Sequence, residues 1–230
     1  MTADDLVYLT ENFPPHNFVK DGRIAGASME ILELIWKKLD CRKTHKDVRL
    51  MPWARAIKRL ENEPNIVLFG MGYSVERVKK FHWIGPYYHH SLSLIAKKKH
   101  RFKIHHINDA KALLIGVVRE DIGHQILLNL GFFPEHLDLS CDIETLFKKI
   151  NYGRFNLVCY ADQAFFKHIS THHPDTADLF ETVLQVSNMR SGFGFSKQVP
   201  LSLVREFQRA LNDLKGTSAL ASILEKYHMP

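Results

Sequence analysis

A serine and an arginine follow a short apolar run in the first third of the chain. Residues 66–69 are four apolar residues bounded by turn formers, which predicts a strand buried on both faces. The run enters Gly70-Met71-Gly72, where glycines without a Cβ let the backbone approach another group closely. Ser74 and Arg77 come next, and a hydroxyl, loop N–H groups and a guanidinium at the end of a strand can bind a carboxylate. The alternative to a carboxylate site is a strand and a loop with an arginine at the protein surface. The residues alone do not decide between the two.

The stretch 67–88 resembles the signature of bacterial extracellular solute-binding proteins of the polar amino-acid type. That family carries a small-residue loop, Thr/Ser-x-Glu-Arg, a basic pair, an aromatic residue and a Pro-Tyr-Tyr ending. The matching segments here are Gly70-Met71-Gly72, Ser74-Val75-Glu76-Arg77, Lys79-Lys80, Phe81 and Gly85-Pro86-Tyr87-Tyr88. In the family this arginine binds the α-carboxylate of an amino acid, so the resemblance implies that role for Arg77.

Two aromatic residues lie where the family places aromatics that cover the ligand. Phe13 belongs to a loop rich in proline and asparagine at 11–18, and Trp53 follows a predicted strand at 48–51. The resemblance therefore implies ligand contacts for Phe13 and Trp53, with Arg55 as a further candidate. Alternatively, Phe13 lies at the edge of the core, and Trp53 and Arg55 pack the start of the next helix.

A second candidate corner follows the apolar strand predicted at 113–118. The strand runs into Arg119-Glu120-Asp121-Ile122 and then a helix, and a helix N-terminus favours anions. The family has Gly-Ser/Thr-Thr in this loop to complete the carboxylate site. Two acids in its place suit a cationic group instead, so Arg119 and Asp121 are candidates for ligand binding. A helix cap is the alternative role of Asp121.

A third candidate lies after Gly153-Arg154, which matches the family pattern Gly-Arg-x-Asp-x-x-x-x-Asp. The final aspartate of that pattern binds the ammonium group of the ligand. Counting places Ala161 there, with Asp162 one residue later and Tyr160 one residue earlier. The resemblance implies Asp162 or Tyr160 for this contact. Alternatively, Asp162 caps the helix predicted at 163–169.

No motif indicates a metal, a cofactor or catalysis. Among 14 histidines there are doublets at 89–90, 105–106 and 172–173, but adjacent residues point in different directions and rarely bind one metal. We therefore expect surface histidines and no metal site, with adventitious zinc as the alternative. The 3 cysteines form no CxxC and no disulfide framework. Because no nucleophile elbow or Ser-His-Asp order is present, we expect a protein that is not an enzyme and has no catalytic residues.

Charge and hydropathy exclude other classes. The net charge is +6, but the basic residues are scattered and no nucleic-acid motif surrounds the densest run, 97–103, so a solvated face is expected. No apolar run is long enough to span a membrane. The first residues lack a charged-then-apolar leader, so the protein is cytoplasmic or its leader has been removed, and the resemblance favours removal.

The resemblance covers residues 6–227 and implies an architecture. We expect an α/β, two-lobed periplasmic-binding-protein-like (type II) fold with two hinge strands. Residues 1–95 and 187–230 would form the first lobe and 96–186 the second. A ligand would be captured by hinge closure of the lobes.

The expected function is that of an extracytoplasmic, periplasmic solute-binding protein that captures a small polar solute, an amino acid or a related compound. Its partner would be the membrane permease of an ABC-type importer, and the protein would be a monomer without cofactor. Three alternatives stay open: a ligand-sensing domain of a signalling system, a small-acid dehydratase-like enzyme of the same fold, and an interaction protein that keeps the fold without binding a ligand.

Overall fold

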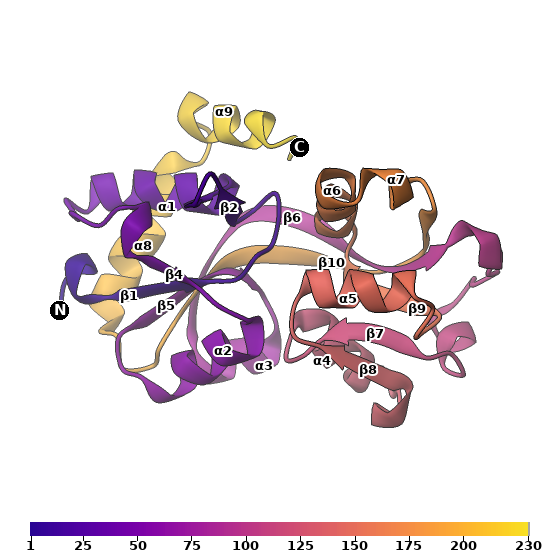
Figure 1. Ribbon diagram of the computed structural model, residues 1–230. Coiled ribbons are helices and arrows are strands. Elements are labelled where there is room, and N and C mark those ends of the chain that lie inside the picture. Colours follow the sequence, from indigo (N-terminus) through magenta and orange to yellow (C-terminus); the bar gives the residue numbers. More distant parts are fainter. Residues whose placement is uncertain (230) are drawn as a thin grey trace. The chain divides into compact units, whose positions relative to one another are not determined.

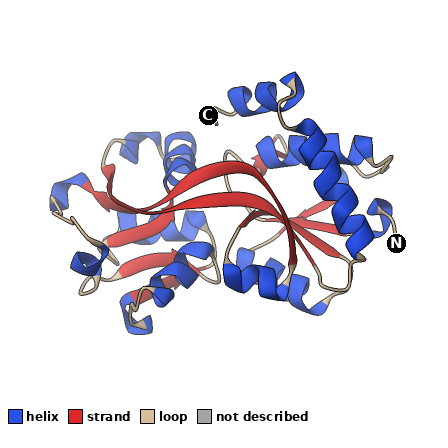
Figure 2. Ribbon diagram, turned by 180° about the vertical axis from the view of Figure 1, so that it is seen from behind, coloured by secondary structure: helices blue, strands red, loops and turns tan. Residues whose placement is uncertain are grey.

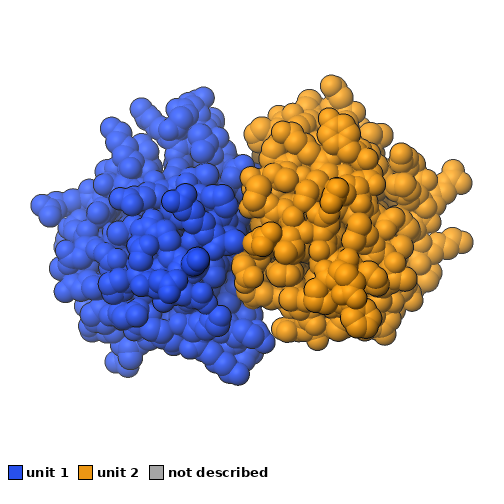
Figure 3. All heavy atoms as spheres, turned by 60° about the horizontal axis from the view of Figure 1, so that its bottom comes forward, with its two compact units in different colours: residues 1–89, 190–230 blue, residues 90–189 orange. Residues whose placement is uncertain are grey.

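The computed structural model describes residues 1–229, and they divide into two compact units. Unit 1 comprises Met1–His89 together with the chain from Arg190 onward, and unit 2 comprises His90–Met189 (Figure 3). Unit 1 is therefore discontinuous in sequence, whereas unit 2 is one continuous segment. The chain passes from unit 1 to unit 2 along β6 (His82–Lys97) and returns along β10 (Phe180–Phe195).

The sheet of unit 1 is mostly parallel. Strand β1 (Val7–Thr10) pairs in parallel with β4 (Val48–Leu50) on one side and with β5 (Ile66–Gly72) on the other. The end of β10 adds to β5 in the antiparallel direction, so that Phe193 lies opposite Phe69. Residues 66–69 are fully buried, as their apolar run predicts. A separate hairpin consists of β2 (Phe18–Lys20) and β3 (Arg23–Ala25).

Among residues 1–229, five α-helices accompany this sheet. They are α1 (Ala27–Lys38), α2 (Trp53–Asn62), α3 (Val75–Lys80), α8 (Leu201–Leu214) and α9 (Ser218–Lys226), with short 3-10 helices η1 (Ala3–Asp5) and η2 (His45–Asp47) (Figure 1). The last of them in the chain, α9, contacts α1. In α1 and α8, Ile35, Trp36 and Phe207 belong to one buried core. Their helical spacing places them on single faces, which is why these segments are amphipathic helices.

The serine at position 28, just before the apolar residues at helical spacing, predicts a helix cap from its residue type, and this prediction is wrong. The helix begins at Ala27 with Gly26 as its N-cap, and the Ser28 hydroxyl shares a buried hydrogen bond of 2.8 Å with the hydroxyl of Tyr87. The N–H groups of Ala27 and Ser28 donate to the carbonyls of Pro15 and His16 instead. Carbonyl groups of a neighbouring loop thus accept hydrogen bonds from the free N–H groups of the first helical turn. In many other helices a serine side chain accepts one of these bonds.

Unit 2 contains two parallel strand–helix–strand crossovers. The strand order is β6, β9 (Leu157–Ala161), β7 (Ile115–Val118) and β8 (Leu137–Ser140), with β7 parallel to both of its neighbours. The helices are α4 (Ile122–Asn129), α5 (Ile143–Asn151), α6 (Asp162–His172) and α7 (Pro174–Ala177), and the 3-10 helices are η3 (Lys98–His100), η4 (Ile107–Ala110) and η5 (Pro134–His136) (Figure 2). No helix of residues 1–229 is both long and apolar enough to cross a membrane.

An ion-pair cluster ties the edge strand of unit 2 to helix α5. Lys149 Nζ lies 2.6 Å from one carboxylate oxygen of Asp138, and Arg154 Nε lies 2.9 Å from the other. The Asp138 side chain is only 12% exposed. Desolvation acts to raise the pKa of Asp138, but the hydrogen bonds from Lys149 and Arg154 outweigh it and lower the pKa below its ordinary value. The folded state therefore favours the ionised carboxylate.

Replacing Asp138 with asparagine is expected to lower the free energy of unfolding of unit 2 by about 1–3 kcal/mol, because the change removes the negative charge and one of the two oxygens that accept from Lys149 and Arg154. Since folding lowers this pKa, the contribution is complete above the unfolded pKa of about 3.9 and is lost as pH falls through the folded value. Urea unfolding of the wild type and of Asp138→Asn at pH 7 and at low pH measures both effects. Asp175→Asn, at an exposed position of unit 2, is the control. Equal losses in the two variants would contradict the prediction.

Candidate functional site

The carboxyl ends of three parallel strands in unit 1 meet at one edge of the sheet. Strands β4, β1 and β5 run in the same direction, so the residues that follow them emerge on the same side. These residues are Trp53 after β4, the loop containing Phe13 after β1, and Ser74 with Arg77 after β5. Ligands of open α/β sheets bind at this edge. The topology thus brings together sequence-predicted residues from three separate segments.

Arg77 is held in a fixed position at this edge. Only 2% of it is exposed. Its Nη1 donates to the carbonyl of Gly72 at 3.0 Å, and its guanidinium carbon lies 5.0 Å from the centroid of the Trp53 ring. A cation over an indole face gains electrostatic stabilisation. Arg77, Gly72 and Trp53 thus lie together in unit 1.

Ser74 positions Arg77 through the backbone. It is the N-cap of α3, and its hydroxyl accepts a hydrogen bond of 3.1 Å from the backbone N–H of Arg77. A serine at this position satisfies one of the helix's unpaired N–H groups and fixes where the first turn begins. Ser74 therefore sets the origin of the short helix that carries the guanidinium.

The loop that carries Phe13 is closed by main-chain and ring contacts. The backbone N–H and carbonyl of Phe13 bond to those of Asn17, at 2.7 and 3.0 Å. Phe13 is 7% exposed, and its ring stacks on the ring of His16 with centroids 4.7 Å apart. Asn17 donates from Nδ2 to the carbonyl of Glu11 at 2.6 Å. The loop is a compact, buried element of unit 1.

Gly70 allows this loop to approach β5. Its φ is +78°, and a Cβ at this position would lie 2.9 Å from Asn17 Oδ1. The backbone angle therefore favours glycine, and an added Cβ would displace the side-chain oxygen of Asn17. The sequence Gly70-Met71-Gly72 predicted that another group approaches this backbone closely. That group is the side chain of Asn17 from the same protein.

Arg55 does not join this group. It is exposed on α2 and lines a shallow basic hollow of unit 1. The other residues lining that hollow are Arg49, Lys58, Arg59, Asn62 and Glu63. Arg55 thus lies on a different face of α2 from Trp53, whose ring is buried.

A second aromatic and cationic group at the end of β5 is absent from the sequence-based candidates. The guanidinium carbon of Arg190 lies 4.0 Å from the centroid of the Tyr73 ring, which meets Trp83 edge-on at 5.2 Å. Trp83 Nε1 donates to the carbonyl of Met71 at 3.1 Å. Tyr73 lies next to the predicted motif, but Arg190 comes from β10, so only the antiparallel pairing of β10 with β5 brings the two together.

Unit 2 carries two acidic residues beyond β7. Asp121 stands at the N-cap position of α4, but its side chain makes no capping hydrogen bond. Glu120 has a left-handed φ of 60°, and its backbone N–H donates to His124 Nδ1 at 3.3 Å. Arg119 is exposed and its backbone N–H donates to the carbonyl of Ser140 at 2.9 Å. Burial lowers the pKa of His124, and this effect outweighs the opposing influence of the Glu120 and Asp121 carboxylates.

Asp162 follows the neighbouring parallel strand β9. It is the first residue of α6, where Ala161 is the N-cap, so the alternative of an Asp162 cap is wrong. Its carboxylate accepts from the Gln163 N–H at 2.6 Å and from the Ser93 hydroxyl at 3.3 Å. Because β7 and β9 are adjacent and parallel, Asp121 and Asp162 emerge at the same edge of unit 2. Tyr160 lies within β9 and is 1% exposed.

Comparison with known proteins decides the family. The profile of the bacterial extracellular solute-binding proteins, family 3, matches residues 6–230. The chain belongs to this family. A sequence search of the curated proteins finds none that matches this solute-binding protein.

Solved structures share the two-lobed periplasmic-binding-protein fold. A histidine kinase sensor domain with similarity to periplasmic binding proteins has a TM-score of 0.85 and 18% identity, covering 96% of this chain and 95% of its own. An ancestral arginine-binding protein bound to arginine has a TM-score of 0.81 and 20% identity, with coverage of 97% and 98%. The arginine-, lysine-, histidine-binding protein ArtJ from Geobacillus stearothermophilus has a TM-score of 0.82 and 16% identity, with coverage of 98% and 96%. These similarities confirm the predicted fold class and the resemblance on which it rested.

In this family 3 protein, the buried polar residues of the Phe13 loop are those that sequence reasoning missed. His16 is 1% exposed and Asn17 is fully buried, although asparagine is mostly exposed in proteins and histidine is intermediate in burial. The ring of His16 lies between Phe13 and Tyr88, at 4.7 and 5.2 Å. The only sequence signal was their position in a proline-rich loop beside Phe13. Their burial depends on the packing of α1 against that loop.

Proposed function

We propose that this chain is an extracytoplasmic solute-binding protein that captures an amino acid with a cationic side chain for the permease of an ABC-type importer. The observation that carries the proposal is Arg77, a buried guanidinium fixed by Gly72 and Trp53 where three parallel strands end. A guanidinium binds a carboxylate with two parallel hydrogen bonds, which gives both affinity and orientation. Arg77 would bind the α-carboxylate, and Phe13 and Trp53 would cover the ligand.

The acids of unit 2 support a cationic ligand. Asp121 and Asp162 follow neighbouring parallel strands, and Glu120 precedes Asp121 where the family has small hydroxyl residues. Carboxylates repel a carboxylate and attract ammonium or guanidinium groups. We assign Asp162 to the α-ammonium group and Asp121 to the cationic side chain. The arginine-binding protein and ArtJ, whose fold is similar, bind ligands of this class.

Hinge closure is the mechanism that would let the residues of both units bind one ligand. In two-lobed binding proteins a few residues at the crossing strands absorb the change in backbone angles. Here β6 and β10 are the two segments through which the chain passes from one unit to the other and back. Tyr73, Trp83 and Arg190 lie on or next to these strands in unit 1.

A thermal-shift comparison of arginine, agmatine and citrulline tests the proposal. Agmatine lacks the carboxylate of arginine, and citrulline replaces the guanidinium with a neutral group of similar shape. Arginine or lysine should raise the melting temperature, because a ligand at about 100 times its Kd adds about 2.7 kcal/mol to the stability of the folded state. Agmatine and citrulline should give much smaller shifts.

The protein must first be unfolded and refolded to remove any ligand retained from expression. A shift with agmatine as large as with arginine would contradict carboxylate binding, and an equal shift with citrulline would contradict the cationic side chain. The absence of a shift with any amino acid would contradict the proposed function itself.

A ligand-sensing domain is the second candidate function. The observation that favours it is the similarity to the sensor domain of a histidine kinase, which extends over 96% of this chain. Such a domain would bind the same class of ligand and would pass the signal to another protein. Uptake of radiolabelled arginine by cells with and without the gene separates the two: loss of uptake supports transport, whereas unchanged uptake with a lost transcriptional response supports sensing.

A further inference from the structure

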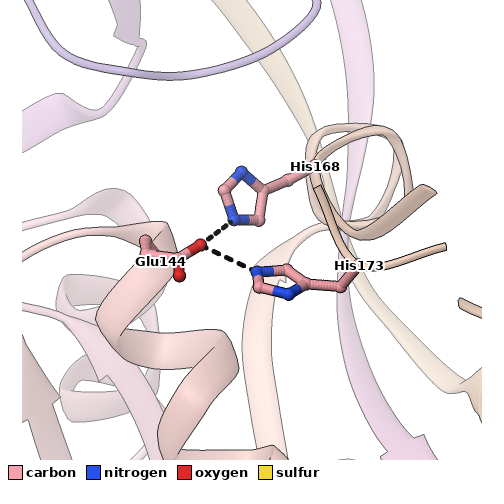
Figure 4. A group of neighbouring side chains, drawn as sticks. All are labelled: Glu144, His168 and His173. Atoms are coloured by element: carbon pink, nitrogen blue, oxygen red, sulfur yellow. Dashed lines mark hydrogen bonds and ion pairs between the residues drawn. The ribbon is translucent and has the colours of Figure 1, made fainter. Parts of the chain in front are cut away.

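Two histidines of unit 2 converge on one carboxylate oxygen. His168 Nε2 lies 2.9 Å and His173 Nε2 lies 3.0 Å from Glu144 Oε2, and the three atoms lie within 4.8 Å of one another (Figure 4). Glu144 belongs to the first turn of α5, His168 to α6, and His173 to the junction between α6 and α7. Glu144 is distant in sequence from the two histidines, and the packing of α5 against α6 brings the three side chains together.

The backbone at each of these residues is fixed. The N–H of His173 donates to the carbonyl of Ile169 at 2.8 Å, and the carbonyl of His173 accepts from Thr176 N–H at 3.0 Å. Asp142 caps α5 through the N–H of Thr145 at 2.8 Å, one residue after Glu144. The three side chains are therefore attached to a rigid frame, which is the requirement for a preorganised metal site.

The imidazole rings are also oriented by stacking. The His173 ring stacks on Phe147 with centroids 4.1 Å apart, and the His168 ring stacks on His172 at 4.7 Å. His172 in turn bonds through Nδ1 to the carbonyl of His168 at 3.0 Å. These contacts point the Nε2 atoms of both ligand rings toward Glu144, as Figure 4 shows.

We propose that Glu144, His168 and His173 bind one zinc-like divalent cation through Oε2 and the two Nε2 atoms. Two imidazoles and one carboxylate are the donor set of zinc sites that keep an open fourth position. The inference goes beyond the proposed function and does not depend on it. The expectation that this protein has no metal site rested on the histidine doublets. The two histidine ligands proposed are His173, which belongs to a doublet, and His168, which lies five positions earlier.

The distances fit such an ion. Zinc lies about 2.0–2.2 Å from nitrogen and oxygen ligands, so ligand atoms around a tetrahedral ion are about 3.3 Å apart. The two nitrogen–oxygen separations here are 2.9 and 3.0 Å, and the third separation is at most 4.8 Å. Glu144, whose side chain is 35% exposed, can move to lengthen the two nitrogen–oxygen separations, and a shift of the partly exposed His173 ring can adjust the separation between the two nitrogens.

Accessibility and charge also fit a bound cation. His168 is 2% exposed, while His173 is 26% exposed, so an ion can enter from the side of His173 and Glu144. Lys148 contacts the other oxygen of Glu144 at 3.0 Å, but its side chain is 60% exposed and can move into solvent. His168 Nδ1 has no hydrogen-bond partner among the described residues, whereas metal-binding histidines usually donate from this nitrogen. We therefore expect an exchangeable ion rather than a permanently bound one.

Zinc titration of the whole chain without a histidine tag tests the proposal. After treatment with a chelator, the protein should bind one zinc ion per chain at micromolar concentrations by isothermal titration calorimetry, with no amino acid present. Cobalt should bind at the same site and give the visible absorption of a tetrahedral complex. His173→Gln and Glu144→Gln should each weaken zinc binding by at least about 10-fold, because each removes a ligand.

Two controls make the result specific. His105→Gln changes an exposed histidine of unit 2 and should leave zinc affinity unchanged. Circular dichroism and the melting temperature without metal will show that each variant is folded, which is expected because the side chains of Glu144 and His173 are both partly exposed. No zinc binding at micromolar concentrations would overturn the proposal. So would affinity that survives both ligand substitutions, or magnesium and calcium binding as tight as zinc binding.

Discussion

Replacing Arg77 with alanine is expected to lower the affinity for the proposed amino-acid ligand by about 2–5 kcal/mol, a factor of roughly 30 to several thousand. The reason is that the ligand carboxylate would lose its charge-assisted hydrogen bonds while it remains buried. The guanidinium is already fixed by Gly72 and Trp53, so little conformational entropy is lost when a ligand binds. Isothermal titration with arginine, on the wild type and on the variant, measures the change.

Two further variants separate a role in binding from a role in folding. Arg77→Lys keeps the positive charge but loses the planar fork, and we expect it to bind more weakly than the wild type and more tightly than Arg77→Ala. Arg205→Ala, at an exposed position of α8 in the same unit, should bind as the wild type does. If Arg77→Ala is folded without ligand and binds arginine with unchanged affinity, the carboxylate site lies elsewhere.

Replacing Gly26 with alanine is expected to lower the free energy of unfolding of unit 1 by about 3 kcal/mol or more. Gly26 has φ +120° and ψ 167°, a conformation that is essentially restricted to glycine. A Cβ there would also lie 2.3 Å from the carbonyl oxygen of His16, which is backbone and cannot move aside as a side chain can. The junction between α1 and the Phe13 loop would have to separate.

Tryptophan fluorescence during urea unfolding measures this loss, because all 3 tryptophans, Trp36, Trp53 and Trp83, belong to unit 1. Gly22→Ala is the matched control. Gly22 also has a positive φ, +73°, but nothing lies within 4 Å of its added Cβ, so only the strain of about 1–2 kcal/mol applies. If both variants lose the same stability, the contact with His16 contributes nothing.

A further consequence is that Gly26→Ala should also weaken ligand binding, since the loop it displaces carries Phe13.

Local sequence patterns predicted the elements but not all of their ends. The apolar runs at 66–69 and 113–118 became β5 and β7 because burial on both faces is visible in composition. The start of α1 was placed one residue too late, because Ser28 has the side chain of a cap. The structure satisfies that helix end with carbonyls from residues 15 and 16, and a contact between distant backbone atoms leaves no mark in local sequence.

The same distinction applies to the functional residues. Motif spacing located Arg77 and Trp53, and the parallel order of β4, β1 and β5 then brought them within 5.0 Å of one another. Arg190 and the group formed by Glu144, His168 and His173 could not be predicted, because they depend on strand pairing and helix packing across long sequence separations. The spacing of residues within one segment predicts a binding site only when that segment contributes most of the residues of the site.

The discontinuity of unit 1 determines the order in which the protein can fold. A ribosome that has reached residue 189 has produced all of unit 2, whereas unit 1 still lacks the end of β10 and all of α8. Until these segments emerge, Phe69 has no Phe193 opposite it, and the core that Phe207 and Leu211 complete stays open to water. Unit 2 can therefore fold during synthesis before the first 89 residues complete their core, and in that interval chaperones have the most exposed apolar surface to protect.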